Sequence, residues 1–251
     1  MNKKKEPITI YWAPYSHVHS SLGEWNLFYE EPYNKHVDLI KNKSKFAESR
    51  NSFFACPAFT DKLKNTYVFK FPMDSSYNYD FSNTQNPIIN PVKSNKPFLK
   101  LYSPRTESLS KKPQITFDLN YLFFCEQPLS ATFSAPYFDE PGYLKYGAVA
   151  PGTFDIGQWF RPYPLEITLW NNIGEFHIKE DEPAFYVEFL TDRPIIIKRF
   201  KATPEVLSYA ESCSKALQTI KVGIPLVERY KKFKNTRMND LVIKEIKENI
   251  L

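Results

Sequence analysis

Two histidines near the N-terminus have the types and spacing that most directly suggest chemistry. His17 and His19 are separated by one residue, and Glu24 follows shortly after them. Two neutral imidazoles and a carboxylate are ligands that suit Fe, Mn or Zn. His177, on a strand predicted later in the chain, can supply one more ligand. The alternative is that these side chains only hydrogen-bond the backbone of their own loop.

This His-x-His pattern with a following glutamate resembles the first metal motif of cupins. The resemblance implies a metal-dependent β-barrel enzyme that uses His17, His19, Glu24 and His177. The chain departs from the motif in two ways: the opening glycine is absent, and little chain precedes the motif to form the strands that normally come first.

A second candidate metal set contains His36 and Asp38, with His177 and Arg193 far along the chain. It is similar to the two-His-one-carboxylate triad of Fe(II)/2-oxoglutarate oxygenases. That family places the first pair at a strand end, whereas apolar spacing predicts a short helix over residues 34–48 of this chain.

Asp155 is the candidate catalytic residue. It stands in Gly152-Thr-Phe-Asp155-Ile-Gly157, ahead of an apolar strand, and this arrangement resembles the third motif of the dUTPase and dCTP deaminase family. The resemblance implies a trimeric barrel in which Asp155 activates water or orients a ribose. The Arg-Ser-Gly phosphate site and the glycine-rich arm of that family are not present. The alternative is a tight turn in which Asp155 hydrogen-bonds its own loop.

Two further groups could bind a ligand or a partner. Arg161, next to Trp159, can stack on a ligand or brace a turn. A basic run also alternates with aromatic residues, which suits either single-stranded nucleic acid or a solvated helix face. Its basic residues are Arg229, Lys231, Lys232 and Lys234.

The order of short motifs within residues 147–200 resembles an uncharacterised β-rich family of phage and bacterial genomes. The motifs are Gly147, Trp159-Phe-Arg161-Pro162 and Asp181-Glu-Pro183 before an apolar strand. This family has no assigned activity, so the resemblance implies a fold and no chemistry.

Composition excludes several classes of protein. The chain has 20 Pro but only 7 Gly and no Gly-x-Gly, which argues against Rossmann and P-loop enzymes. The net charge of +5 is spread along the chain, so nucleic acid is not a favoured partner. Three isolated cysteines predict a reduced compartment. We find no long apolar run and no secretory signal, and therefore expect a cytoplasmic protein, or a virion-associated one if it is phage-encoded.

Alternating apolar residues predict strands at residues 8–12, 25–29, 67–71, 114–124, 165–169, 185–189 and 195–197, and the apolar run 51–57 predicts another that ends at Pro57. Thr203-Pro204-Glu205 marks a helix start, followed by an apolar stripe through Val206, Ala210 and Cys213. We expect a mainly β fold, an antiparallel sandwich or barrel of jelly-roll or dUTPase-like form, with a C-terminal helical segment. The expected division is a β-rich body over 1–202, loop-rich over 73–113, and a helical segment over 203–251 that packs on the body or on a partner.

No complete catalytic set is visible: Gly-x-Ser-x-Gly is absent and the chain has only 4 His. The favoured hypothesis is therefore a non-catalytic structural or protein-interaction protein without a cofactor. Its expected partners are other protein subunits, including copies of itself. The metal-dependent β-barrel enzyme with Fe, Mn or Zn and the dUTPase-like nucleotide-processing enzyme remain as alternatives.

Overall fold

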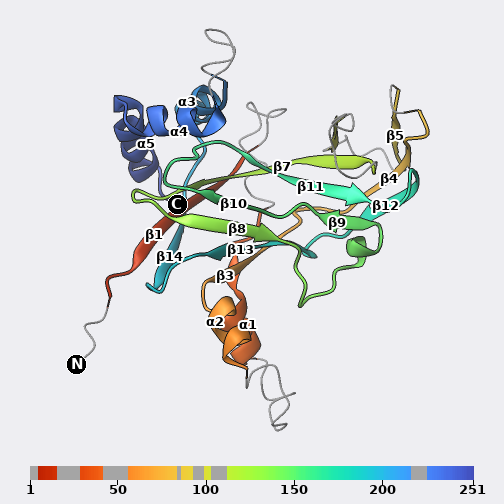
Figure 1. The fold of residues 1–251 in the computed structure, drawn as a ribbon, viewed down its shortest axis with the longest axis horizontal. Coiled ribbons are helices and arrows are strands. Elements are labelled where there is room, and N and C mark those ends of the chain that lie inside the picture. Colours follow the sequence, from red (N-terminus) through yellow and green to blue (C-terminus); the bar gives the residue numbers. More distant parts are fainter. Residues whose placement is uncertain are drawn as a thin grey trace.

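A computed structural model describes residues 5–15, 29–41, 56–83, 86–92, 99–102, 112–215 and 225–251. In this part of the chain the protein is mainly β, with three sheets, C-terminal helices and no closed barrel (Figure 1). The prediction of a mainly β fold with a C-terminal helical segment is therefore confirmed. No helix in the described ranges is long and apolar enough to cross a membrane.

Sheet A is mixed, and β7 lies at its centre. Its described strands run in the order β14-β1-β7-β11-β9, with β6 beside β7 on the side of β1. The pairing of β1 with β14 is parallel, and the other pairings are antiparallel. The strands are β1 (Ile8–Tyr15), β6 (Leu99–Tyr102), β7 (Gln114–Phe124), β9 (Gly147–Val149), β11 (Tyr163–Leu169) and β14 (Ile195–Arg199).

Sheet B is antiparallel and packs against one face of sheet A. Its strands are β10 (Gly152–Asp155), β8 (Ser130–Ser134), β13 (Pro183–Phe189), β3 (Thr66–Lys70) and β2 (Tyr33–Asn34), in that order. The core between the sheets is rich in aromatic side chains: Phe69 stacks on Phe185 with ring centroids 5.2 Å apart and also contacts Tyr121 from β7. The high aromatic content of the chain is therefore used largely to fill this core.

Sheet C contains β12 (Ile173–Ile178), β4 (Ser75–Asp80) and β5 (Ile88–Pro91) in antiparallel order. In Figure 1 it lies at one end of the molecule, with β5 farthest from the helices. Strand β4 falls within the predicted loop-rich region. Its density of Ser and Asn hides a regular alternation in which Tyr77 and Tyr79 are buried and their neighbours face outward.

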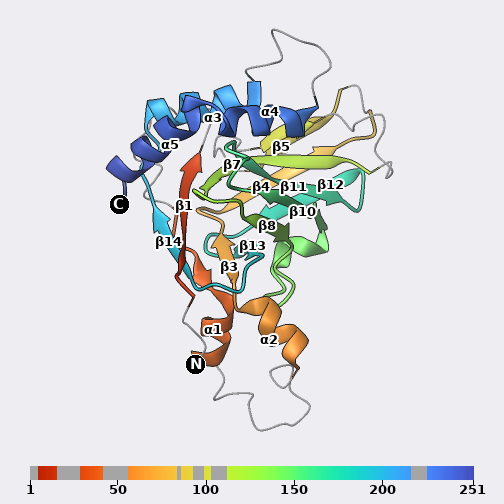
Figure 2. The ribbon, with the colours of Figure 1, turned by 60° about the vertical axis from the view of Figure 1, so that its left-hand side comes forward.

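Three C-terminal helices cover the other face of sheet A (Figures 1 and 2). They are α3 (Pro204–Lys215), α4 (Leu226–Lys234) and α5 (Arg237–Glu248). The predicted stripe Val206, Ala210 and Cys213 is buried there, in one apolar cluster with Tyr11 and Leu122 of the sheet. The helices thus pack on their own chain. The continuation of the stripe at positions 217 and 220 lies outside the described residues.

The chain leaves sheet A after β14, forms the three C-terminal helices, and returns to the end of β14. Thr203 Oγ1 accepts a hydrogen bond from Val206 N at 3.2 Å, so it caps α3 as the sequence predicted. After α5, Ile250 forms an isolated antiparallel bridge with Phe200, and Leu251 N donates to Arg199 O at 3.0 Å. The residues after α5 therefore continue the pairing of sheet A next to β14.

Two predicted elements near the N-terminus differ from expectation. Pro57 begins a helix, α2 (Pro57–Leu63), rather than ending a strand, because proline fits the first helical turn, where its missing N–H costs nothing. The strand predicted before Pro57 and most of that predicted over 25–29 lie outside the described residues. Helix α1 (Lys35–Lys41) confirms the described part of the helix predicted over 34–48. A 3₁₀ turn, η4 (Gly142–Lys145), precedes β9.

Candidate functional site

The outer face of sheet C carries acidic, amide, hydroxyl and imidazole side chains beside aliphatic ones. Alternate residues of β12, β4 and β5 point to this face and form cross-strand rows. One row is Ile173, Asp80 and Ile88, the next is Glu175, Asn78 and Asn90, and the third is His177, Ser76 and Val92, whose N–H bonds the Ser76 carbonyl.

The opposite face of the same strands holds these residues in place. Tyr79, Phe176 and Ile178 are buried in the main core and fix the register of β4 against β12. Gly174 leaves room for the side chain of Tyr79 opposite it, because a Cβ at this position would lie 2.9 Å from Tyr79 Oη. The register decides that Ser76 and His177 are direct neighbours across the strands.

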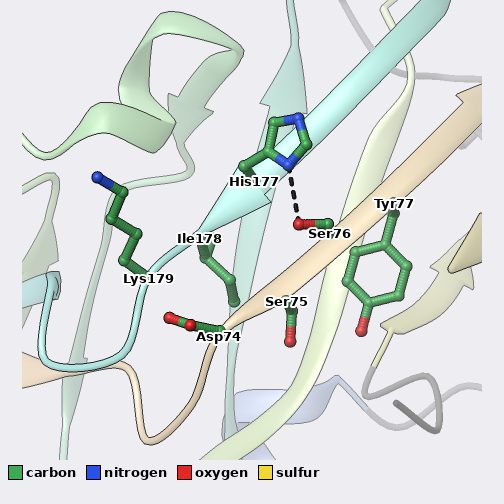
Figure 3. Close-up of a pocket in the computed structure, with 7 residues that line it drawn as sticks. All are labelled: Asp74, Ser75, Ser76, Tyr77, His177, Ile178 and Lys179. Carbon is green, nitrogen blue, oxygen red and sulfur yellow. Dashed lines mark hydrogen bonds between the residues drawn. The ribbon is translucent and has the colours of Figure 1, made fainter. Parts of the chain in front are cut away.

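Ser76, His177 and Glu175 form a continuous hydrogen-bonded chain. His177 Nδ1 lies 2.8 Å from Ser76 Oγ, and His177 Nε2 lies 3.0 Å from Glu175 Oε2 (Figure 3 shows the first bond). An ionised carboxylate only accepts hydrogen bonds, so in a neutral imidazole Nε2 carries the hydrogen and Nδ1 accepts from the serine hydroxyl. This arrangement can move a proton from Ser76 to the imidazole while Glu175 stabilises the resulting positive charge.

A cavity of about 350 Å³ adjoins this chain. Its lining residues are Asp74, Ser75, Ser76, Tyr77, His177, Ile178 and Lys179. The side chain of His177 is 41% exposed and that of Glu175 is 63% exposed, so the relay is open to solvent. A small solute can therefore reach the Ser76 hydroxyl.

A second hollow of about 370 Å³ lies at the other end of the face, between Ile173 and Ile88. These two side chains are 60% and 52% exposed, and Asp80 lies between them in the same row. Aliphatic side chains this exposed on both sides of a hollow are typical of a surface that contacts another molecule.

Most of the first predicted metal set cannot be placed. His17, His19 and Glu24 lie outside the described residues, while His177 is bonded to Ser76 and Glu175 as above. Within the described ranges no group of three or more His, Cys, Asp or Glu side chains could hold a metal ion.

The second predicted metal set is distributed over separate elements. His36 and Asp38 lie on α1, where Asp38 is 3.3 Å from Lys35 Nζ. Arg193 donates to the backbone carbonyl of Glu6 at 2.7 Å and to the side chain of Gln127 at 2.9 Å. These contacts tie the start of β1 to neighbouring segments.

Asp155 organises the turn that follows β10. Its Oδ1 accepts from Leu129 N at 3.0 Å and from Gly157 N at 2.8 Å, and its Oδ2 accepts from Gln158 Nε2 at 2.6 Å. Both carboxylate oxygens thus have donors from the protein itself. This matches the turn interpretation of the motif, in which the carboxylate bonds its own loop.

Arg161 and Trp159 join the β body to helix α4. The guanidinium carbon of Arg161 lies 4.9 Å from the centroid of the Trp159 ring, and Arg161 Nη1 donates to Tyr230 Oη at 3.2 Å. Tyr230 also contacts the Trp159 ring, with centroids 4.7 Å apart. Nearby, burial raises the pKa of the Cys213 thiol to about 11. These residues serve the packing of α3 and α4 on the body.

The basic run on α4 is split between solvent and protein. Lys231 and Lys232 are exposed, whereas Lys234 Nζ is buried and has no hydrogen-bond partner in the described structure. The aromatic residues of the run, Tyr230 and Phe233, are buried against sheet A. The side chain of Arg229 lies outside the described part.

Sequence reasoning missed Ser76 and Glu175. Ser76 is 101 positions from His177, and only the pairing of β4 with β12 brings them together. The available signal was the Ser-Tyr-Asn-Tyr alternation of β4, which predicts that Ser76 and Asn78 share a face. The pairing partner of β4 could not be read from that signal.

Comparison with protein-family models, curated proteins and solved structures gives no significant match. The functional argument therefore depends on the residues and geometry described above.

Proposed function

We propose that this chain is a structural subunit that binds a second copy of itself through the outer face of sheet C. The observation that carries the proposal is the exposure of Ile173, Ile88 and Val92, at 60%, 52% and 48%, on one side of a small sheet. The other side of the sheet packs into the main core through Tyr79, Phe176 and Ile178, so the exposed residues are not needed to hold the sheet in place. Covering them would remove apolar area from water.

Charge supports a head-to-tail contact between copies. The outer face carries two carboxylates, Asp80 and Glu175, beside its aliphatic residues. Helix α4 presents the complementary combination, with Val227 62% exposed and Lys231 and Lys232 in solvent. Opposite charges around an apolar contact favour correct docking. Because different patches meet, such a contact would produce rings or filaments.

Light scattering and sedimentation velocity over a range of concentrations test this proposal. We expect the mean mass to rise with concentration and Ile173→Asp to return it to the monomer value. Ile196→Asp, at a comparably exposed position on β14, should leave association unchanged. Lys231→Glu should weaken association, and Glu175→Lys in the same chain should restore part of it.

A wild-type protein that stays monomeric at about 100 µM would refute the proposal, because a contact with a Kd of about 10 µM would then be largely formed. Equal loss of association in Ile173→Asp and Ile196→Asp would also refute it, since the contact would not be specific to sheet C.

We also propose that the body is a jelly-roll form of β fold. The support is the alternation of successive strands between the two packed sheets: β7 lies in sheet A and β8 in sheet B, β10 in B and β11 in A, and β13 in B and β14 in A. Such crossing connections are characteristic of jelly rolls.

A further inference from the structure

We propose that Ser76 is a nucleophile for acyl transfer, with His177 as its general base and Glu175 as the positioning residue. The proposal does not rest on the assembly contact. Both proposals use the outer face of sheet C: Ser76 and His177 lie in the row of Val92, whereas Ile173 and Ile88 lie two rows away, with Glu175 in the row between.

The geometry meets the requirements for an activated serine. The Oγ–Nδ1 distance of 2.8 Å is within hydrogen-bond reach, and the second imidazole nitrogen is held by a carboxylate at 3.0 Å. A base oriented by a third group is the arrangement that activates a serine hydroxyl. The roles are assigned by these contacts, although the ring is turned so that Nδ1, rather than Nε2, faces the serine.

The surroundings allow a substrate to approach. The adjoining cavity of about 350 Å³ suits the acyl part of a small ester. Among its lining residues Lys179 carries a positive charge and Asp74 a negative one. The substrate class is therefore a small, uncharged carboxylic ester, for which neither charged residue creates a strong preference.

The reaction balances with water as the only co-reactant. Ser76 Oγ bonds to the ester carbonyl carbon as its proton moves to His177 Nδ1. The bond from this carbon to the alkoxy oxygen then breaks, and the leaving alcohol takes the proton from Nδ1. Water then bonds to the carbonyl carbon as Nδ1 takes its proton, the bond from this carbon to Ser76 Oγ breaks, and Oγ takes the proton back from Nδ1 as the carboxylic acid leaves. Glu175 keeps its charge throughout and stabilises the imidazolium.

The test is covalent labelling of the full chain by an alkyl fluorophosphonate, read by intact mass and peptide mapping. The Ser76 oxygen bonds to phosphorus, fluoride leaves, and His177 takes the proton. We expect one adduct per chain, located on Ser76 and absent in Ser76→Ala. His177→Gln should slow labelling by about 100-fold or more.

Ser82 provides a matched control. It lies next to β4, and its hydroxyl is bonded to the Asp80 carboxylate at 2.6 Å with no imidazole between them. Ser82→Ala should label at the wild-type rate. Glu175→Gln should slow labelling by about tenfold, and Glu175→Asp, which keeps the charge, should recover part of the rate. A purely structural role would not produce this recovery.

The proposal is overturned if the wild-type chain gains no adduct, or if the adduct persists in Ser76→Ala. It is also overturned if His177→Gln labels at the wild-type rate while melting at the same temperature. Repeating the labelling on Ile173→Asp separates the two proposals: an adduct on that variant supports the nucleophile whether or not the chain associates.

The turnover substrate is p-nitrophenyl acetate, for which Ser76→Ala should show only the background rate of ester hydrolysis.

Discussion

At the scale of single residues, the most informative contrast is between Asp155 and Ser76. Asp155 stands in a motif that suggests catalysis, yet both its oxygens accept hydrogen bonds from neighbouring segments. Ser76 stands in no motif, yet its hydroxyl bonds an oriented imidazole. Hydrogen-bond partners therefore separate a residue that shapes a turn from one that can react.

Replacing Asp155 with alanine should destabilise the protein. The change leaves the N–H groups of Leu129 and Gly157 without their acceptor, and we expect a loss of about 2–3 kcal/mol in the free energy of unfolding. Asp155→Asn should lose less, because its amide oxygen can still accept from both groups. Urea denaturation measures both values; an unchanged stability of Asp155→Ala would show that the turn does not depend on these bonds.

At the scale of elements, close backbone approaches decide where glycine is required. A Cβ on Gly157 would lie 2.3 Å from the Gln127 carbonyl oxygen, whereas a Cβ on Gly152 would meet nothing within 4 Å. Both glycines flank the same short segment, so their different surroundings make them a natural pair for comparison.

Gly157→Ala should therefore lower the free energy of unfolding by about 2 kcal/mol or more, since backbone must shift to admit the methyl group. Gly152→Ala, in open space, should stay within about 0.5 kcal/mol of the wild type. Thermal and urea unfolding of the two variants give the comparison. If both variants lost similar amounts of unfolding free energy, the close approach of Gly157 to the Gln127 carbonyl would not be the cause of the loss.

The junction between helices offers a second test at this scale. Thr203 Oγ1 accepts from Val206 N and donates to Glu245 Oε1 at 2.8 Å, which connects α3 to α5. Thr203→Ala should cost about 1–2 kcal/mol, and Thr203→Ser should retain most of the stability. If the serine variant is as unstable as the alanine variant, the hydroxyl is not the group responsible.

At the scale of the whole molecule, the helices matter because they cover a face of sheet A that would otherwise be exposed. Val206, Ala210 and Val242 pack there against Tyr11 and Leu122. Cys213 lies in the same cluster, where burial raises the pKa of its thiol to about 11. The docked helices are therefore favoured while this thiol is neutral.

This burial predicts loss of stability at alkaline pH. Because the pKa of Cys213 is higher in the folded state, its contribution is complete below about pH 8.5 and is lost as the pH rises to about 11. The loss should amount to about 2–3 kcal/mol. Urea denaturation between pH 8 and 11 should show this decline, and Cys213→Ala should make it shallower. Part of the decline should remain, because burial also raises the pKa of the Cys125 thiol and that of Tyr11, to about 12. Cys56→Ala, at an exposed position, should not change the slope.

The sequence was sufficient for elements whose apolar residues recur regularly. It predicted β7, β11, β13 and the capped start of α3, because alternation and capping are local signals. It could not predict how strands pair, and β4 of sheet C was missed because this strand is rich in Ser and Asn. The contact of Ser76 with His177 depends on the pairing of β4 with β12, so Ser76 and Glu175 could not be found from the sequence. His177 was proposed from the sequence, but as a metal ligand.

The position of β1 between β14 and β7 in sheet A has a consequence for how the chain is made. Residues 8–15 leave the ribosome long before their parallel neighbour β14, which ends at Arg199, and Ile250 bridges Phe200 directly after it. Strand β1 must therefore wait until Arg199 has been synthesised before its edge next to β14 is paired. Such long-range pairing slows folding and leaves an open edge exposed to other nascent chains. Synthesis of this protein should accordingly benefit from chaperones that shield β1 until β14 has been made, and slower translation alone should not remove that need.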